Sequence, residues 1–196
     1  MGKIVCLMGK SSSGKDTIYK NLLVQGQIAL RPMVPYTTRP IRAGEQEGVE
    51  YHFTDEKGFQ KLMGSGSVIE ERAYHTCLGL WRYFTVADEG MELERYSYVM
   101  IGTLEAYAHM KKFYGADRIV PVMIELDDGL RLQRALDRER RQDHPKYEEM
   151  CRRFLADAED FSDEKLTKAG IDRTFYNGNL ERCLEEIVIY LQEMLD

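Results

Sequence analysis

The chain has 196 residues, of which 43% are hydrophobic, and it carries a formal net charge of −6. This length suits one α/β domain with a small inserted subdomain, and the apolar content is enough for a core. The acidic balance excludes a sequence-independent grip on nucleic acid, because such binding needs a basic surface that displaces counterions from the phosphates.

The cysteines and the N-terminal segment bear on the compartment. The cysteines lie far apart without a CxxC pair, which indicates neither a zinc site nor a disulfide framework: Cys6, Cys77, Cys151 and Cys183. The apolar run at the N-terminus is about six residues long, too short for a signal peptide or a membrane span. We therefore expect a soluble, unprocessed, cytoplasmic protein with no membrane partner.

The first expected elements are a buried strand and a helix. Residues 3–8 are mostly apolar, as in a strand that is buried on both faces. A helix is expected over 15–25, because Ile18, Leu22 and Leu23 recur at helical spacing on one face.

The loop between them matches the pattern G-x-x-x-x-G-K, in the strand-loop-helix context that the pattern requires. Backbone N–H groups of such a loop face the β-phosphate of a nucleotide, and the lysine lies between β and γ oxygens. The alternative is a chance glycine-serine turn with a surface lysine, which both flanks disfavour. The loop predicts an ATP site formed by Gly9, Ser11, Ser12, Ser13, Gly14, Lys15, Asp16 and Thr17.

Asp16 departs from the usual pattern, which has Ser or Thr at this position to coordinate Mg²⁺. A carboxylate is a good hard-oxygen ligand, so Asp16 is the candidate ligand for Mg²⁺, either directly or through water.

The rest of the chain predicts an insertion followed by alternating strands and helices. From residue 32 to 89 the pattern is irregular, with short aromatic stretches, prolines and glycines, and it indicates a small β-rich insertion. Strands are then expected over 96–102, 119–126 and 171–176, and helices over 104–114, from 128, over 146–160 and over 180–195. The last helix presents an apolar face with Leu184, Ile187 and Leu191.

This alternation predicts a three-layer α/β P-loop fold with a parallel sheet core. The expected core is 1–34 and 91–196, the insertion that binds the acceptor is 35–90, and a helical lid lies at about 131–150, where a proline interrupts the helices.

The insertion begins with a run in which two arginines stand three residues apart, followed by a glycine hinge and a tyrosine: Arg39, Arg42, Gly44 and Tyr51. Guanidinium groups pair bidentately with phosphate oxygens, and an acceptor phosphate must be held in line with the γ-phosphate of ATP. On composition alone, a solvated basic hairpin is an equal alternative.

This run resembles the acceptor domain of the guanylate kinase family, which carries T-T-R-x-x-R-x-G-E-x-x-G-x-x-Y, and the resemblance extends more loosely over nearly the whole chain. It implies transfer of the ATP γ-phosphate, with Mg²⁺, to a nucleoside monophosphate, which is GMP in that family. It also implies phosphate contacts from Arg39, Arg42, Tyr51 and Tyr83, with Thr38 and Thr85 in the same substrate site. Glu71 or Glu70 would match the acidic residue that binds the base, and Glu71 is the residue we assign.

The resemblance weakens at the base pocket. Pro35 replaces a family serine, a few residues are inserted between Glu71 and Tyr83, and the strand over 96–102 lacks a D-x-D pair. The residues that would bind the phosphate match the family pattern, whereas those that would contact the base differ from it. The preferred base is therefore left open.

Arginines crowd the expected lid. Charge runs are usually solvated helix faces, but Arg131, Arg134 and Arg138 recur at spacings of three and four and so share one face. The resemblance places catalytic lid arginines at Arg138, Arg134 and one of Arg152 and Arg153, beside Lys15 and Arg39. Of the last pair, Arg153 is the residue we assign. Phosphoryl transfer depends on positioning and on cations, which this set supplies.

Asn177 precedes the last helix. Similar kinases use an asparagine near the adenine at this point, whereas a turn followed by an N-cap is an equal alternative.

The leading interpretation is a nucleoside monophosphate kinase that acts as a monomer or homodimer on a small-molecule acceptor. The alternatives are a kinase for a different phosphorylated small molecule and a non-catalytic guanylate-kinase-like module that binds phosphoproteins. Modules of that type have usually lost the nucleotide loop, whereas Gly9, Gly14 and Lys15 are present here.

Overall fold

The computed structural model describes residues 1–42, 44–76, 79–87 and 90–195. Its larger sheet is parallel and has the strand order β2-β7-β1-β8-β9. The strands are β1 (Ile4–Gly9), β2 (Leu30–Pro32), β7 (Ser97–Ile101), β8 (Ile119–Glu125) and β9 (Thr174–Tyr176).

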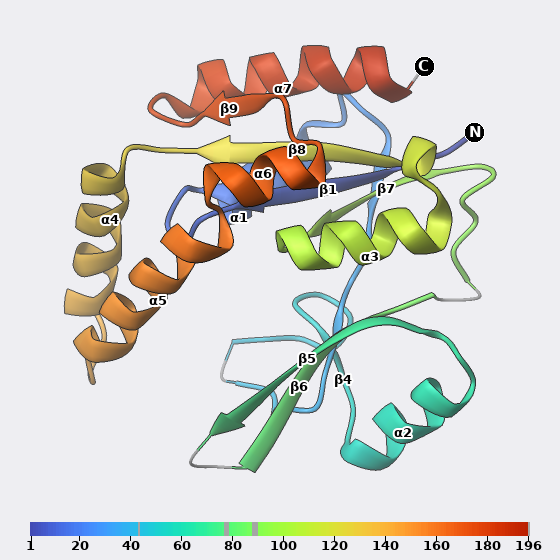
Figure 1. Ribbon diagram of the computed structural model, residues 1–196, viewed down its shortest axis with the longest axis horizontal. Coiled ribbons are helices and arrows are strands. Elements are labelled where there is room, and N and C mark those ends of the chain that lie inside the picture. Colours follow the sequence, from blue (N-terminus) through green and yellow to red (C-terminus); the bar gives the residue numbers. More distant parts are fainter. Residues whose placement is uncertain (43, 77–78, 88–89, 196) are drawn as a thin grey trace.

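Helices cover both faces of this sheet. One face packs on α1 (Lys15–Gln25) and α7 (Leu180–Leu195), and the other on α3 (Leu104–Tyr114) and α6 (Asp163–Ala169). Figure 1 shows α7 above the sheet and α3 and α6 below it. The predicted three-layer α/β fold with a parallel sheet core is therefore confirmed.

Strand β1 explains why the N-terminal run is apolar throughout. Ile4, Cys6 and Met8 pack towards α3 and α6, whereas Val5 and Leu7 pack towards α1 and α7. A strand buried on both faces needs apolar residues at every position. The predicted apolar face of α7 is likewise buried, at Leu184, Ile187 and Leu191.

The second sheet has the order β4-β3-β6-β5 and lies within the expected insertion. Its strands are β3 (Tyr36–Thr37), β4 (His52–Phe53), β5 (Val68–Thr76) and β6 (Gly79–Val86). Strand β2, by contrast, belongs to the larger sheet, beside β7.

Two helices were not predicted from the sequence. Helix α2 (Glu56–Gly64) packs Phe59 on Phe84 of β6, with ring centroids 4.9 Å apart, and Asp55 caps it by accepting the Gly58 N–H. Helix α6 buries Leu166 in the core. Both helices are short, so their apolar periodicity is weak and packing decides them.

The arginine-rich segment forms two helices, α4 (Asp128–Arg140) and α5 (Tyr147–Asp160), which lie side by side (Figure 1). The break expected at the proline lies between them. A 3-10 turn, η1 (Ala116–Arg118), leads from α3 into β8. No helix in the described ranges combines the length and apolarity needed to cross a membrane.

Candidate active site

The predicted phosphate loop joins β1 to α1 at the carboxyl edge of the parallel sheet. Its backbone takes positive φ at Gly9 (152°), Ser12 (63°) and Gly14 (95°). A Cβ on Gly9 would lie 2.5 Å from the Ile124 carbonyl oxygen, and one on Gly14 would lie 2.2 Å from Asn177 Nδ2. Both glycines are therefore required by close approach as well as by conformation.

Asn177 anchors this loop from the end of β9. Its Nδ2 donates to the Ser13 carbonyl at 2.7 Å, and its own N–H donates to the Glu125 carbonyl at 2.8 Å. Asn179 makes the helix cap instead, because its Oδ1 accepts the Arg182 N–H at 3.0 Å. The two asparagines of the turn thus have separate roles.

Two serine hydroxyls in the loop lack partners. The Oγ atoms of Ser12 and Ser13 are buried and have no hydrogen-bond partner within the described residues. Buried polar groups are normally paired. Oxygens of a bound phosphate group would satisfy them.

Lys15 is the first residue of α1. Burial lowers its pKa, and the Asp16 and Asp157 carboxylates partly offset this shift. A desolvated ammonium group at a helix N-terminus favours the binding of a polyanion over the binding of an anion with a single charge.

Asp16 and Thr17 are exposed at the start of the same helix. The Asp16 carboxylate accepts no hydrogen bond from the described residues. Those residues also contain no group of three or more His, Cys, Asp or Glu that could hold a metal alone. Mg²⁺ is usually held by one or two carboxylates plus substrate phosphates and waters, so an exposed Asp16 beside a phosphate loop fits it.

The predicted lid arginines differ in their distance from the loop. Arg153 Nη2 donates to the Ser11 hydroxyl at 3.4 Å, and Arg134 Nη1 lies 3.6 Å from the place of a Cβ on Gly14. Arg138 is exposed farther along α4. The structure therefore brings Arg153 and Arg134 to the loop.

Two residues at this loop were not predicted from the sequence as site residues. Arg131, which was expected only on an arginine face, donates through Nε to the Ser11 carbonyl at 3.1 Å. Asp157, for which no role was expected, accepts the Ser11 N–H at 2.7 Å. Arg131 lies four residues before Ala135, so the two share one face of α4, and Ala135 is the other buried residue of this helix. This spacing is the sequence signal that could have marked Arg131 as buried.

Arg39 forms the centre of the second cluster. Its side chain is 3% exposed and donates to both carboxylate oxygens of Glu45, at 2.5 and 2.7 Å. This fork lowers the pKa of Glu45 to about 2 and raises the pKa of Arg39. The guanidinium also lies 5.0 Å from the centre of the Tyr51 ring. A phosphate can replace a carboxylate as the partner of a buried arginine, because both anions pair with the same guanidinium donors.

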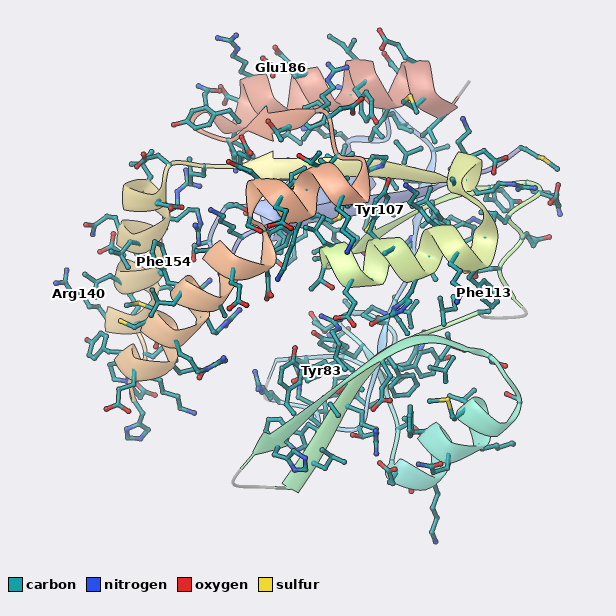
Figure 2. The ribbon with its side chains drawn as sticks, viewed as in Figure 1. Tyr83, Tyr107, Phe113, Arg140, Phe154 and Glu186 are labelled. Atoms are coloured by element: carbon teal, nitrogen blue, oxygen red, sulfur yellow. The ribbon has the colours of Figure 1, made fainter. Side chains whose placement is uncertain are left out.

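Tyr83 adjoins this cluster from the β5–β6 hairpin, where Figure 2 labels it, and its ring centroid lies 5.6 Å from that of Tyr51. Burial raises the pKa of Tyr51, so this phenol stays protonated as a donor. Arg42 is exposed, and its N–H donates to Glu45 at 2.9 Å. Thr38 is engaged with Arg82, whose N–H donates to the Thr38 hydroxyl at 2.9 Å.

The two adjacent glutamates of β5 face opposite ways. Glu70 is buried, accepts the Thr85 hydroxyl at 2.8 Å and lies 3.3 Å from Arg72 Nε. Glu71 instead pairs with Arg82, and both of these side chains are partly buried. Glu70 lies on the same face of the hairpin as its cross-strand partner Thr85, whereas the partner of Glu71, Arg82, also pairs with Glu56 of α2. Burial, and after it the charge of Glu70, raises the pKa of Cys6 in β1 to about 12.

The end of β7 explains why an aspartate is missing there. A Cβ on Gly102 would lie 2.9 Å from the Cys6 Sγ, so no side chain fits at this position without a shift of the core. Thr103 caps α3 by accepting the Ala106 N–H. The end of β7 therefore carries no carboxylate at Gly102 or Thr103.

Among the cysteines, Cys6, Cys151 and Cys183 are free, and Cys77 lies outside the described residues.

Comparisons with known proteins agree with this arrangement. A family profile described as guanylate kinase matches residues 1–79. A guanylate kinase of Schizosaccharomyces pombe is 41% identical over 68 residues, which cover 35% of this chain and 34% of that protein. The chain thus spans about a third of the length of that relative.

Longer matches cover most of the chain. A guanylate kinase of Paraburkholderia xenovorans is 28% identical over 190 residues, 95% of this chain and 77% of that protein. The crystal structure of guanylate kinase from Anaplasma phagocytophilum superposes with a TM-score of 0.64 at 20% identity, covering 99% of this chain and 86% of that one. The chain is thus similar to guanylate kinases, through the family profile over its first 79 residues and through a longer match at lower identity over most of its length.

Proposed function

We propose that this protein transfers the γ-phosphate of ATP to a nucleoside monophosphate, and that its acceptor is GMP. The observation that carries the proposal is the presence on one chain of two separate phosphate sites. One is the loop with Lys15, and the other is the buried Arg39 beside Tyr51 and Tyr83. A kinase needs both sites, because donor and acceptor phosphates must be held at once.

The donor site would hold the nucleotide through the loop N–H groups and Lys15. Arg153 and Arg134 overhang this loop and would meet the charge that develops on the transferring phosphoryl group. Asp16 would hold Mg²⁺ together with the nucleotide, and the bound ion would supply positive charge that neutralises the phosphates. Asn177 supports the loop from behind and is proposed as a positioning residue.

The acceptor site would hold the monophosphate through Arg39, Arg42 and the two tyrosines. An acceptor phosphate oxygen then forms a bond to the γ-phosphorus while the bond from that phosphorus to the β–γ bridging oxygen breaks, and ADP leaves. Glu45 has a specific part in this site. It keeps the Arg39 guanidinium paired until the acceptor phosphate arrives.

We propose Glu70, rather than Glu71, as the base contact, together with Thr85. Guanine presents the N1–H and N2–H donors side by side, and a carboxylate accepts both. Adenine presents an acceptor at N1, which would leave the buried Oε2 of Glu70 without a hydrogen bond, and a buried acceptor without a donor is costly. This chemistry favours GMP over AMP even without the missing aspartates.

The same proposal keeps the division of the chain into a core (1–34 and 91–196), an acceptor-binding insertion (35–90) and a lid at about 131–150. Closure of the insertion and lid over the sheet edge would bring Arg39 towards Lys15 and exclude water.

The test is an ADP-release assay with Mg-ATP and each common ribo- and deoxyribonucleoside monophosphate, beside a Lys15→Ala variant. We expect turnover with GMP, lost in the variant. Turnover with a different base would refute Glu70 as the guanine reader but keep the kinase. Binding of ATP without turnover on any monophosphate would indicate another phosphorylated acceptor, and absence of both would refute the donor site.

A further inference from the structure

Ser11 is the third residue of the phosphate loop, and each of its polar groups is bound by a lid side chain. Asp157 Oδ2 accepts its N–H at 2.7 Å, and Arg131 Nε donates to its carbonyl at 3.1 Å. Arg153 Nη2 donates to its hydroxyl at 3.4 Å. All three partners come from α4 and α5, more than a hundred residues along the chain.

Arg131 and Asp157 also pair with each other. The Arg131 Nη2 to Asp157 Oδ2 distance is 3.3 Å, and Nη1 of the same guanidinium pairs with Asp128. The Arg131 side chain is 1% exposed and that of Asp157 is 16% exposed. Phe154 of α5, which Figure 2 labels beside α4, covers the guanidinium at 4.8 Å.

A buried arginine is costly unless its donors are used. Here Nε donates to the loop backbone, and the other two guanidinium nitrogens pair with the side chains of Asp128 and Asp157. A simple tie between two helices would need only the side-chain contacts. The pair therefore has a geometry that fixes one peptide of the loop.

We propose that Arg131 and Asp157 are positioning residues that hold the Ser11 peptide, and with it the phosphate-binding conformation of the loop from Ser12 to Lys15. This inference rests on the proposed donor site but not on the identity of the acceptor. Ser12, directly after the clamped peptide, has a φ of 63°, which a non-glycine residue keeps only where its surroundings enforce it.

The same pair sets the place of Arg153. Residues four apart lie on one helix face, so anchoring Asp157 to the Ser11 N–H places Arg153 over the Ser11 hydroxyl. The contacts of Arg131 and Asp157 with Ser11, here called the clamp, thus link the conformation of the loop to the position of the Arg153 guanidinium. Loss of the clamp should weaken nucleotide binding and slow transfer without changing contacts to the acceptor.

The experiment uses the double variant Arg131→Leu/Asp157→Ala in the full-length chain. Replacing a buried ion pair by apolar residues often leaves stability unchanged, so the fold should be kept. The matched control is Arg140→Leu/Asp137→Ala, which removes an exposed pair on α4 (3.9 Å), with Arg140 projecting away from α5 (Figure 2).

Three experiments are made: titration to give the Kd values for Mg-ATP and Mg-ADP without acceptor, hydrogen exchange of the loop amides, and steady-state kinetics to give kcat and the KM for the acceptor. We expect at least about a tenfold rise in both Kd values, faster exchange at Ser11 to Lys15, and a lower kcat at constant acceptor KM. The control should match the wild type.

Wild-type nucleotide affinity and loop exchange in a folded double variant would overturn the proposal. If the double variant does not fold, Asp157→Asn and Asp157→Ala decide. Asparagine keeps an oxygen for the Ser11 N–H, so the proposal requires tighter ATP binding by Asp157→Asn than by Asp157→Ala, and equal affinities would overturn it. Failure of the wild type to phosphorylate GMP would refute the acceptor assignment alone, because the Kd values and exchange rates are measured without acceptor.

Discussion

Asn177 Nδ2 lies 2.7 Å from the Ser13 carbonyl oxygen, although 164 residues separate the two in the chain. Asn177 is 3% exposed, so this bond is made away from water. Asn177→Ala should leave a buried carbonyl unpaired and lower the free energy of unfolding by about 1–3 kcal/mol. It should also raise the Kd for ATP, because the loop loses its support.

Thermal unfolding and ATP titration check this prediction. Asn21→Ala is the control, since Asn21 Nδ2 also donates to a backbone carbonyl, that of Thr17 at 2.8 Å, but at an exposed position. Equal losses of stability in the two variants would contradict the role of burial.

The neighbours Glu70 and Glu71 allow a direct comparison within one strand. Glu70→Gln should weaken GMP recognition by about 1–3 kcal/mol, because the amide can no longer accept both guanine donors. Glu71→Gln weakens the ion pair with Arg82, which also pairs with Glu56 at 2.9 Å. This variant should therefore change the KM for GMP less than Glu70→Gln does. Steady-state kinetics with GMP measures both effects. A larger effect of Glu71→Gln than of Glu70→Gln would indicate Glu71 as the base contact.

Arg153→Ala should lower kcat by at least about tenfold with little change in the KM for GMP, because its guanidinium overhangs the donor loop and would act on the transition state. Arg182→Ala, on α7 and paired with Glu186 at 3.0 Å, is the comparison. A rise in the KM for GMP at unchanged kcat would show that Arg153 serves acceptor binding instead.

The Arg39–Glu45 fork predicts a pH dependence of stability. Hydrogen bonds from Arg39 lower the pKa of Glu45 from the ordinary 4.5 to about 2. A lowered pKa in the folded state stabilises the fold above pH 4.5, and this contribution is lost as the pH falls from 4.5 through about 2.

Glu45→Gln should therefore lower Tm at pH 7, and the difference from the wild type should shrink between about pH 4.5 and pH 2. Thermal unfolding across this range measures it, with Glu185→Gln on the exposed side of α7 as control. A difference that stays constant with pH would contradict the charged fork.

Elements whose signals lie in neighbouring residues could be predicted from the sequence. The phosphate loop was found because its glycines, Lys15 and the flanking strand and helix are contiguous, and their conformation depends on neighbours in the chain. The alternating strands and the apolar face of α7 were found because burial imposes a period on residues within one element.

Contacts between side chains of distant elements could not be predicted in this way. The register of β5 against β6 shifts between Val68 and Glu70, and a shift of one residue exchanges the two faces of a strand, so the inward glutamate could not be assigned from the sequence. Arg131 and Asp157 carry no local sign of their contact with Ser11, because that contact depends on how α4 and α5 pack beside the loop. Local periodicity describes the face on which a residue lies, whereas the partner on that face is set by packing between elements distant in the chain.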